Sequence, residues 1–298
     1  MQPSRQPSLP GAARYVLTLA ASSARGQVAA LSAMLERHDA YIEEFAVFDD
    51  VLVSRFYVRT VFRLEGVGAG PAELGVLREA YARLVAGFDD AEGAIHEMSR
   101  PTRVLIMVSK ADHCLRNLLD QWRRGELNMD VVAVVSNHAD LAPIAQAEGL
   151  PFYHLPITAD TKPQQEAALL QCIQQHGAEL VVLARYMQVL SEGMCHTLAG
   201  RVINIHHSFL PGFKGARPYE QAHARGVKLI GATAHFATTD LDEGPIIEQA
   251  LERVDHAFSP EQLLRTGRDV ECLALGRALR YVLEHRVFIN GLRTVVLR

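Results

Sequence analysis

The amino-acid sequence predicts two domains in tandem: a small ferredoxin-like α+β domain, then a larger, doubly wound α/β domain with a mostly parallel sheet. Up to Met98, strands and helices are predicted in the order βαββαβ, which is the ferredoxin-like order. From Arg103 onward, nearly continuous apolar strands alternate with helices, which is typical of a parallel sheet covered on both faces. A chain of 298 residues is long enough to give each domain its own core.

The smaller domain is expected to span residues 13–98, after a disordered tail, residues 1–12, that contains three prolines. Its first helix carries an apolar stripe at helical spacing that includes Leu31 and Leu35. The pair Asp49-Asp50 between two strands suits a hairpin turn. The predicted elements, in order, are strand 15–20, helix 26–38, strands 42–48 and 54–64, helix 72–86 and a short strand 94–98.

The larger domain is expected to span residues 101–298. Its strands are apolar along their whole length, as expected where a parallel sheet is buried on both faces. Asn290-Gly291 between two short apolar runs predicts a closing hairpin. The other predicted elements are strands 104–108, 131–135, 151–155, 180–184, 202–205 and 229–236, and helices 112–124, 141–149, 163–176 and 260–284.

Composition and charge exclude several classes of function. Lys and Arg number 30 against 34 Asp and Glu, without a basic patch, so we expect no nucleic-acid and no membrane partner. No apolar run reaches the roughly 18 residues that span a bilayer, and the first residues lack the apolar core of a secretory signal. The four cysteines lie far apart without C-x-x-C spacing, which is typical of reduced thiols. We therefore expect a cytoplasmic protein.

The polar residues that carry chemistry follow two strands in the second half of the chain. Successive strand side chains point to opposite faces, so Asn204 and His206 should project together while His207 points away. The loop after the next strand contains Asp242, which can return beside them. An amide can stabilise an oxyanion, an imidazole can transfer protons at neutral pH, and a carboxylate can fix the imidazole tautomer. These three residues are the predicted catalytic groups for hydrolysis or transfer of a carbonyl-level group.

No covalent nucleophile is apparent in the sequence. The chain has no G-x-S-x-G elbow and no evident Cys-His pair, so attack by water or by an acceptor amine is the simpler hypothesis. Metal-ligand spacing of the H-x-H or H-x-x-x-H type is absent around His206 and His207. A metal-dependent amidohydrolase is therefore the weaker alternative, and we expect neither a metal nor a cofactor.

Two runs of sequence carry a resemblance to a known family. They are NIHHSFLPGFKGARPY, residues 204–219, and GATAHFATTDLDEGPII, residues 231–247. Together they resemble the formyltetrahydrofolate-dependent formyltransferase superfamily, and within it most closely the formyltetrahydrofolate deformylases. The family's N-x-H and L-D-x-G-P motifs fall here on Asn204, His206 and Asp242, so the resemblance implies that these residues are the catalytic Asn, His and Asp.

The same resemblance implies a folate site. The segment Ala184 to Leu190 is similar to the superfamily's pterin-binding motif, in which backbone groups bind the pterin edge and apolar side chains form a wall. Related deformylases often carry Arg where Gln188 stands here. Ser208 and His235 are candidates for supporting the catalytic groups from behind. The implied substrate-binding residues are Met187, Gln188, Val189, Leu190, Thr238, Thr239 and Asp240.

The smaller domain resembles the ACT domain that precedes the catalytic part of the deformylases, in element order and in the run SRFYVRTVFRLEG. The resemblance implies a homo-oligomer, a dimer or tetramer formed through this domain, and a possible amino-acid effector bound at the turn of Ser23, Arg25 and Gly26. The family usually has an acidic residue where Ser23 stands. A purely structural assembly module is therefore an equal alternative to an effector site.

The turn from Ser109 to Cys114 distinguishes two related functions. Backbone N–H groups that cradle a phosphate usually need glycines, and this turn has none. Glycinamide ribonucleotide formyltransferase, the superfamily member that acts on a phosphoribosyl amine, carries a glycine there, so its absence favours water as the formyl acceptor. We therefore predict hydrolysis of 10-formyltetrahydrofolate to formate and tetrahydrofolate, supplying formate to one-carbon and purine metabolism. The alternatives are formyl transfer to an amine and a non-catalytic folate-sensing protein.

Overall fold

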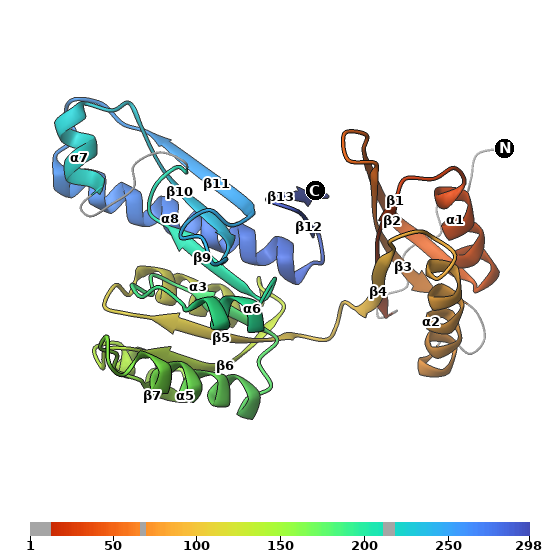
Figure 1. Cartoon of the computed structure of the whole chain (residues 1–298), viewed down its shortest axis with the longest axis horizontal. Helices are drawn as coiled ribbons and strands as arrows, with labels where there is room; N and C mark the ends of the chain where they lie inside the picture. Colours follow the sequence, from red (N-terminus) through yellow and green to blue (C-terminus); the bar gives the residue numbers. More distant parts are fainter. Residues whose placement is uncertain (1–12, 66–69, 211–217) are drawn as a thin grey trace. The chain divides into compact units, whose positions relative to one another are not determined.

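The structure, a computed structural model, describes residues 13–65, 70–210 and 218–298 (Figure 1). The predicted tail, residues 1–12, lies outside the described residues, as do residues 66–69 and residues 211–217 of the run after Asn204. The chain forms two compact units. Among the described residues, the first unit contains those up to 100 together with 284–288 and 297–298, and the second contains those between 101 and 283 together with 289–296. The end of the chain, which was assigned to the larger domain, is thus shared between the units.

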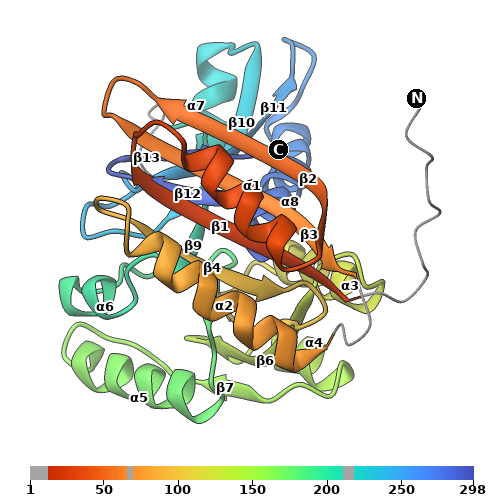
Figure 2. The same ribbon diagram turned by 90° about the vertical axis from the view of Figure 1, so that its right-hand side faces the viewer.

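The first unit has the predicted βαββαβ order. It consists of β1 (Arg14–Ser22), α1 (Gln27–Arg37), β2 (Ala40–Asp50), β3 (Arg55–Leu64), α2 (Pro71–Val85) and β4 (Glu92–Glu97). The four strands form one antiparallel sheet in the order β2-β3-β1-β4. Both helices cover one face (Figure 2), where Leu31 of α1 and Leu77 of α2 pack with Leu17 and Leu19 of β1. The ferredoxin-like prediction is confirmed.

The hairpin between β2 and β3 differs from the prediction. Asp49 and Asp50 remain in β2, paired with Phe56 and Arg55, and the turn lies at residues 51–54. Asp50 begins this turn, because its side-chain oxygen accepts a hydrogen bond from the backbone N–H of Leu52 at 3.2 Å. Asp therefore acts here by bonding to the backbone two residues on, which is one of its usual roles in turns.

The second face of this small sheet is covered by the end of the chain. Phe56 and Val58 of β3 belong to the core under the helices, so the alternating residues Tyr57 and Arg59 point the other way. The ring of Tyr57 lies 5.4 Å from that of Phe288, and Arg59 Nε donates to the backbone oxygen of Glu284 at 3.0 Å. This packing explains why both residues are almost fully buried.

The second unit is built on a seven-stranded sheet in the order β11-β10-β9-β8-β5-β6-β7. The five strands from β9 to β7 are parallel to one another, β10 runs antiparallel to β9, and β11 runs antiparallel to β10. The predicted mostly parallel sheet is therefore confirmed. The strands are β5 (Thr102–Val108), β6 (Met129–Ser136), β7 (Phe152–His154), β8 (Leu180–Leu183), β9 (Val202–His206), β10 (Leu229–Phe236) and β11 (Ile246–Arg253).

Helices cover both faces of this sheet (Figure 1). Leu105 and Met107 of β5 pack with Leu169 of α5 and Met194 of α6, and the alternating residue Ile106 faces the opposite layer. The helices are α3 (His113–Arg123), α4 (Ala142–Ala147), α5 (Lys162–Gln175), α6 (Glu192–Thr197), α7 (Pro218–Arg225) and α8 (Pro260–Leu283), and a two-stranded sheet of β12 (Val287–Asn290) and β13 (Arg293–Val296) ends the chain. No helix within the described ranges is long and apolar enough to cross a membrane.

The strand order places a topological switch point beside β5. From β5 the chain moves outward through β6 to β7, then returns to the other side of β5 to form β8 and β9. Ligands of open α/β sheets bind at the carboxyl ends of the strands at such a point. The residues that follow β5, β8 and β9 are therefore the place to look for a functional site.

Candidate active site

A cavity of about 270 Å³ opens at the carboxyl ends of β8 and β9. Asn204 and His206, two residues apart on β9, both line it. β10 runs antiparallel to β9, so His235 stands directly opposite Asn204 in the strand register. The loop that follows β10 brings Asp242 to the same cavity. The structure thus brings together the three residues that the sequence predicted as catalytic.

The imidazole of His206 is held by Asp242. Its Nδ1 lies 3.2 Å from Asp242 Oδ2, whereas its Nε2 is buried and makes no hydrogen bond to a described residue. With Nδ1 donating to the carboxylate, the neutral ring carries its lone pair on Nε2. This is the arrangement of an imidazole that a carboxylate orients for proton transfer.

Asp242 is ionised in this setting. Its pKa is held well below the usual value chiefly by hydrogen bonding with His206, against a smaller opposing effect of burial. The carboxylate lies between two imidazoles, because His235 Nε2 is 3.7 Å from Asp242 Oδ1. A negative charge at this position favours protonation of His206 when a proton arrives.

His235 orients the amide of Asn204. The His235 ring is almost fully buried, and its Nδ1 lies 2.9 Å from the backbone oxygen of Phe236, to which it donates. In the neutral ring Nε2 is then an acceptor, and it lies 3.2 Å from Asn204 Nδ2. One N–H of the amide is held by His235, and the second N–H remains to be donated to a ligand.

The backbone of the acidic loop is shaped by two unusual residues. Asp242 itself is in the left-handed region, with φ 59°, which is uncommon for a residue other than glycine. Two residues later, a Cβ on Gly244 would lie 1.8 Å from the backbone oxygen of Phe236. The loop can therefore return against the end of β10 only with glycine at this position.

The chain after His206 is held by polar residues that the sequence did not single out. Thr233 Oγ1 donates to the backbone oxygen of Ser208 at 2.9 Å and accepts from the N–H of Leu210 at 3.0 Å. Gln249 of β11 donates to both Thr233 and the Leu210 oxygen. Ser208 is buried and does not line the cavity. It therefore lies behind the catalytic candidates, where a supporting residue was predicted.

The orientation predicted for His207 is wrong. β9 ends at His206, so the alternation of strand side chains does not extend to the next residue. The rings of His206 and His207 lie 4.7 Å apart between centroids, and both residues line the cavity.

The predicted folate segment forms one wall of the cavity and is anchored at both ends. The N–H of Met187 donates to Ser109 Oγ at 2.9 Å, and Ser109 in turn donates to Asn137 at 2.6 Å. At the other end, Glu166 of α5 accepts hydrogen bonds from the N–H and the hydroxyl of Ser191. Ser109 and Asn137 follow β5 and β6, so the segment is tied to the switch point of the sheet.

The side chains of this wall suit a flat, partly apolar ligand. Met187 and Val189 are 58% and 52% exposed although they are apolar, and exposed apolar side chains around a cavity are typical of binding sites. Gln188, Leu190 and Thr238 also line the cavity. Thr239 and Asp240, which the resemblance placed in the folate site, are exposed and do not line it.

Comparison with known proteins shows which family the chain resembles. The formyl transferase family matches residues 102–279. A formyltetrahydrofolate deformylase of Corynebacterium sp. (strain P-1) is 49% identical over 96% of this chain and 98% of its own length. The crystal structure of a formyltetrahydrofolate deformylase from Burkholderia mallei is 58% identical, covers 96% of this chain and all of its own, and superposes with a TM-score of 0.91.

The chain belongs to the formyltetrahydrofolate deformylase family. A more distant structure, a glycinamide ribonucleotide transformylase of Symbiobacterium toebii, is 33% identical with a TM-score of 0.64. It covers 97% of its own length but only 68% of this chain. The likeness to the deformylases therefore spans both units, as the sequence resemblance implied.

The turn predicted to hold an effector lies in the first unit of this family member. Gly26 is left-handed, with φ 86°, and the side chain of Gln27 closes the turn by bonding to Ser22 and Ala24. The hydroxyl of Ser23 donates to Asp49 of β2. A carboxylate is thus present beside this turn, supplied by a neighbouring strand, which the local sequence could not reveal. Arg25 is exposed.

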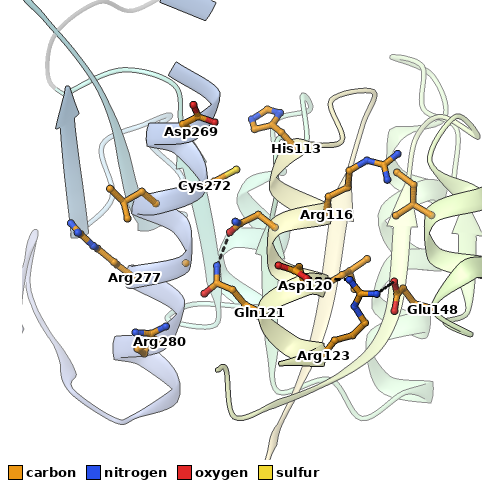
Figure 3. Close-up of a pocket in the computed structure, with 15 residues that line it drawn as sticks. His113, Arg116, Asp120, Gln121, Arg123, Glu148, Asp269, Cys272, Arg277 and Arg280 are labelled. Atoms are coloured by element: carbon orange, nitrogen blue, oxygen red, sulfur yellow. Dashed lines mark hydrogen bonds and ion pairs between the residues drawn. The ribbon is translucent and has the colours of Figure 1, made fainter. Parts of the chain in front are cut away.

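A larger hollow of about 850 Å³ lies between α3 and α8, away from these catalytic candidates (Figure 3). Several of its arginines are already paired with carboxylates. Arg116 lies 2.6 Å from Asp112, and Arg123 lies 3.1 Å from Asp120 and 3.6 Å from Glu148. The charges of these two arginines are therefore balanced by neighbouring carboxylates.

Proposed function

We infer that the chain hydrolyses 10-formyltetrahydrofolate to formate and tetrahydrofolate. The observation that carries this inference is the geometry around His206, whose Nδ1 faces an ionised carboxylate while its Nε2 has no partner among the described residues. Membership of the deformylase family across both units supports it. The absence of glycine from the turn after β5, Ser109 to Asp112, is consistent with water as the formyl acceptor.

In the proposed mechanism, Asp242 and His206 position a water molecule beside the formyl carbon. His206 Nε2 takes a proton as the water oxygen bonds to that carbon, and the charge of Asp242 stabilises the imidazolium. The amide of Asn204, oriented by His235, donates to the oxygen that becomes negative. The imidazolium then returns the proton to N10 as the bond between carbon and N10 breaks, which leaves formic acid and tetrahydrofolate.

The folate is proposed to lie along the wall from Met187 to Leu190, where the backbone contacts the pterin edge and the side chains contact its face. Thr238 lies on the other side of the cavity. Thr239 and Asp240 remain substrate-binding candidates only if the loop moves toward the ligand.

The decisive experiment is to measure formate release by chelator-treated protein with 10-formyltetrahydrofolate as the only substrate. We expect one formate for each tetrahydrofolate formed. If the substrate disappears only when an amine is added, and no formate forms, the reaction is formyl transfer. If the protein binds the folate but does not convert it, the protein is a folate sensor.

We further propose that the first unit, residues 13–98 in the predicted division, serves chiefly for assembly of a dimer or tetramer. β2 is an edge strand of its sheet, and the adjoining turn exposes Val51 and Leu52 by 76% and 83%. Unpaired strand edges and exposed apolar side chains are suited to pairing between subunits. Sedimentation of the full-length protein tests this proposal, and a monomer at micromolar concentration would contradict it.

A further inference from the structure

Behind the candidate active site, one buried carboxylate joins four elements of the second unit. Glu271 lies on α8 and is 1% exposed. His113 Nε2, at the start of α3, is 2.7 Å from its Oε2, and Tyr219 of α7 donates to its Oε1 at 2.9 Å. Arg185 Nε, just after β8, lies 3.3 Å from Oε2. Figure 3 shows His113 on α3 and Cys272, the neighbour of Glu271, on the facing helix α8.

The packing around this carboxylate is close. A Cβ on Gly267, one turn before Glu271 on α8, would lie 2.1 Å from the hydroxyl oxygen of Tyr219. The ring of Tyr219 therefore lies directly against the helix, which brings its hydroxyl to the carboxylate. Such a contact requires a particular side chain on each element, which is a sign of a built site rather than of chance proximity.

Glu271 is ionised despite its burial. Burial alone would raise its pKa, but the hydrogen bond with His113 and the charge of Arg185 outweigh burial and hold the pKa below the usual value. The side chains of His113, Cys114 and Glu271 are close enough to hold a metal ion. Arg185 already supplies a cation to this carboxylate, so the cluster is better suited to orienting Arg185 than to binding a metal.

Arg185 connects this cluster to the cavity. It lines the cavity with Asn204 and His206, and it is the first residue of the wall that continues through Met187 and Val189. Its backbone is in the left-handed region, with φ 63°, a costly conformation for a residue other than glycine that persists only where its surroundings hold it. The ion pair with Glu271 is a side-chain contact able to hold it.

We propose that Glu271 is a positioning residue that orients Arg185 and, through it, the folate-binding wall of the cavity. The identity of the ligand in this proposal, a folate, rests on the proposed hydrolysis of 10-formyltetrahydrofolate. Glu271 itself does not touch the ligand. Without its charge, Arg185 would be a partly buried cation with no counterion, would turn toward solvent or into the cavity, and would release the backbone at the start of the wall.

The test uses full-length protein and compares Glu271→Gln with the wild type. Tetrahydrofolate binding is measured by calorimetry, and KM and kcat are measured by formate release. We expect the Kd and KM to rise about tenfold or more, because Arg185 would lose the counterion that holds it, while kcat changes less. Asp269→Asn removes an exposed charge two residues away on the same helix, and this control should stay within about twofold.

A double-mutant cycle separates positioning from a purely structural role. In an Arg185→Gln background, Glu271→Gln should have little further effect on the Kd, because the group through which it acts is gone. An equal rise in Kd with and without Arg185, or a lower melting temperature with an unchanged Kd, would overturn the proposal. If Glu271→Gln fails to fold, Glu271→Asp replaces it, because the shorter side chain withdraws the carboxylate from Arg185 while the charge is kept. The Kd should then rise less than for loss of the charge, and again only when Arg185 is present. Absence of formate release by the wild type would refute the hydrolysis instead, since the binding cycle needs no turnover.

Discussion

His206 and Asp242 are distant in the chain. Their side chains meet because β10 pairs with β9 and the loop that follows β10 returns to the cavity lined by His206. At the scale of single residues, the site is a set of pairings in which each group determines the hydrogen-bonding state of the next. Phe236 O fixes His235, His235 holds the amide of Asn204, and Asp242 fixes His206. The expected effects of substitution follow from these pairings.

Replacing His206 with alanine should lower kcat by about 100- to 10,000-fold, the usual contribution of a positioned acid–base group. Tetrahydrofolate should still bind with a similar Kd, because the ring acts on the formyl carbon rather than on the pterin. Formate release and calorimetry on the same preparation check both parts. A variant within about tenfold of the wild type would remove His206 from the proton transfer.

Asn204→Asp should be at least as damaging to kcat as Asn204→Ala. The two variants lose the same donor, but a carboxylate would in addition repel the oxygen that becomes negative during attack. Parallel measurements of kcat for the two variants make the comparison. If the Asp variant retained full activity, Asn204 would not be the group that stabilises the oxyanion.

Acid should weaken the contribution of Asp242 to folding. Its pKa in the folded protein is lowered, so its contribution to the free energy of unfolding is present above the usual value of 3.8 and is lost as the pH falls toward the lowered value. The difference in unfolding free energy between wild type and Asp242→Asn should therefore shrink as the pH falls below about 4. Denaturant titrations across this range measure the difference. A gap that widened on acidification would contradict the assigned ionisation.

At the scale of secondary-structure elements, the acidic loop depends on how closely it approaches the end of β10. The N–H of Phe236 donates to the backbone oxygen of Pro245 at 2.9 Å, and Gly244 lies between them without room for a side chain. The loop therefore has one path back to β11, and that path places Asp242 in the cavity.

Gly244→Ala should displace this loop. Because the new methyl group would overlap the Phe236 oxygen, we expect a loss of stability of about 1–3 kcal/mol and a fall in kcat as Asp242 moves away from His206. Gly75→Ala is the matched control, since Gly75 lies in α2 with no atom near the new methyl group, and alanine is the better helix former there. Thermal unfolding and formate release compare the two variants. If the two variants had the same stability and kcat, the loop after β10 would be able to adopt another backbone conformation that still places Asp242 beside His206.

At the scale of the whole molecule, the end of the chain belongs to both units. α8 carries Glu271 within the second unit, and the residues that follow it, 284–288, pack on the sheet of the first. Arg59 is central to this packing, because it is almost fully buried and bonds both Glu44 and the Glu284 oxygen. Residues 284–288 are therefore covalently joined to α8, the helix that carries Glu271.

We nevertheless expect little response to amino acids. Ser23 stands where relatives of the first unit commonly have an acidic residue, and the nearby Asp49 carboxylate is already bonded by the Ser23 hydroxyl. Useful coupling changes affinity by about 5- to 150-fold, so a titration with methionine or glycine can resolve it. We expect less than a twofold change in formate release, with the oligomer retained. A several-fold change at millimolar amino acid would show that an effector site is present.

Much of the architecture could be predicted from the sequence because its signals are local. Apolar periodicity located β1, α1 and β10 to within about two residues, and the spacing of Asn204 and His206 on one strand already placed them on one face. Three elements, α6, α7 and β11, were not among the predicted ones. α6 is a single short helix, and β11 is an edge strand whose exposed half carries charged residues.

Tertiary structure decided the features that depend on groups distant in sequence. The left-handed backbone of Asp242, the proximity of His207 to His206, the four-element cluster around Glu271 and the packing of residues 284–288 have no local signal, because each is produced by contacts between separate elements. The sequence alone therefore indicated most of the order of the elements and the candidate chemical groups. Only the folded chain determined which of those groups share a hydrogen bond, since that depends on strand order and on close packing.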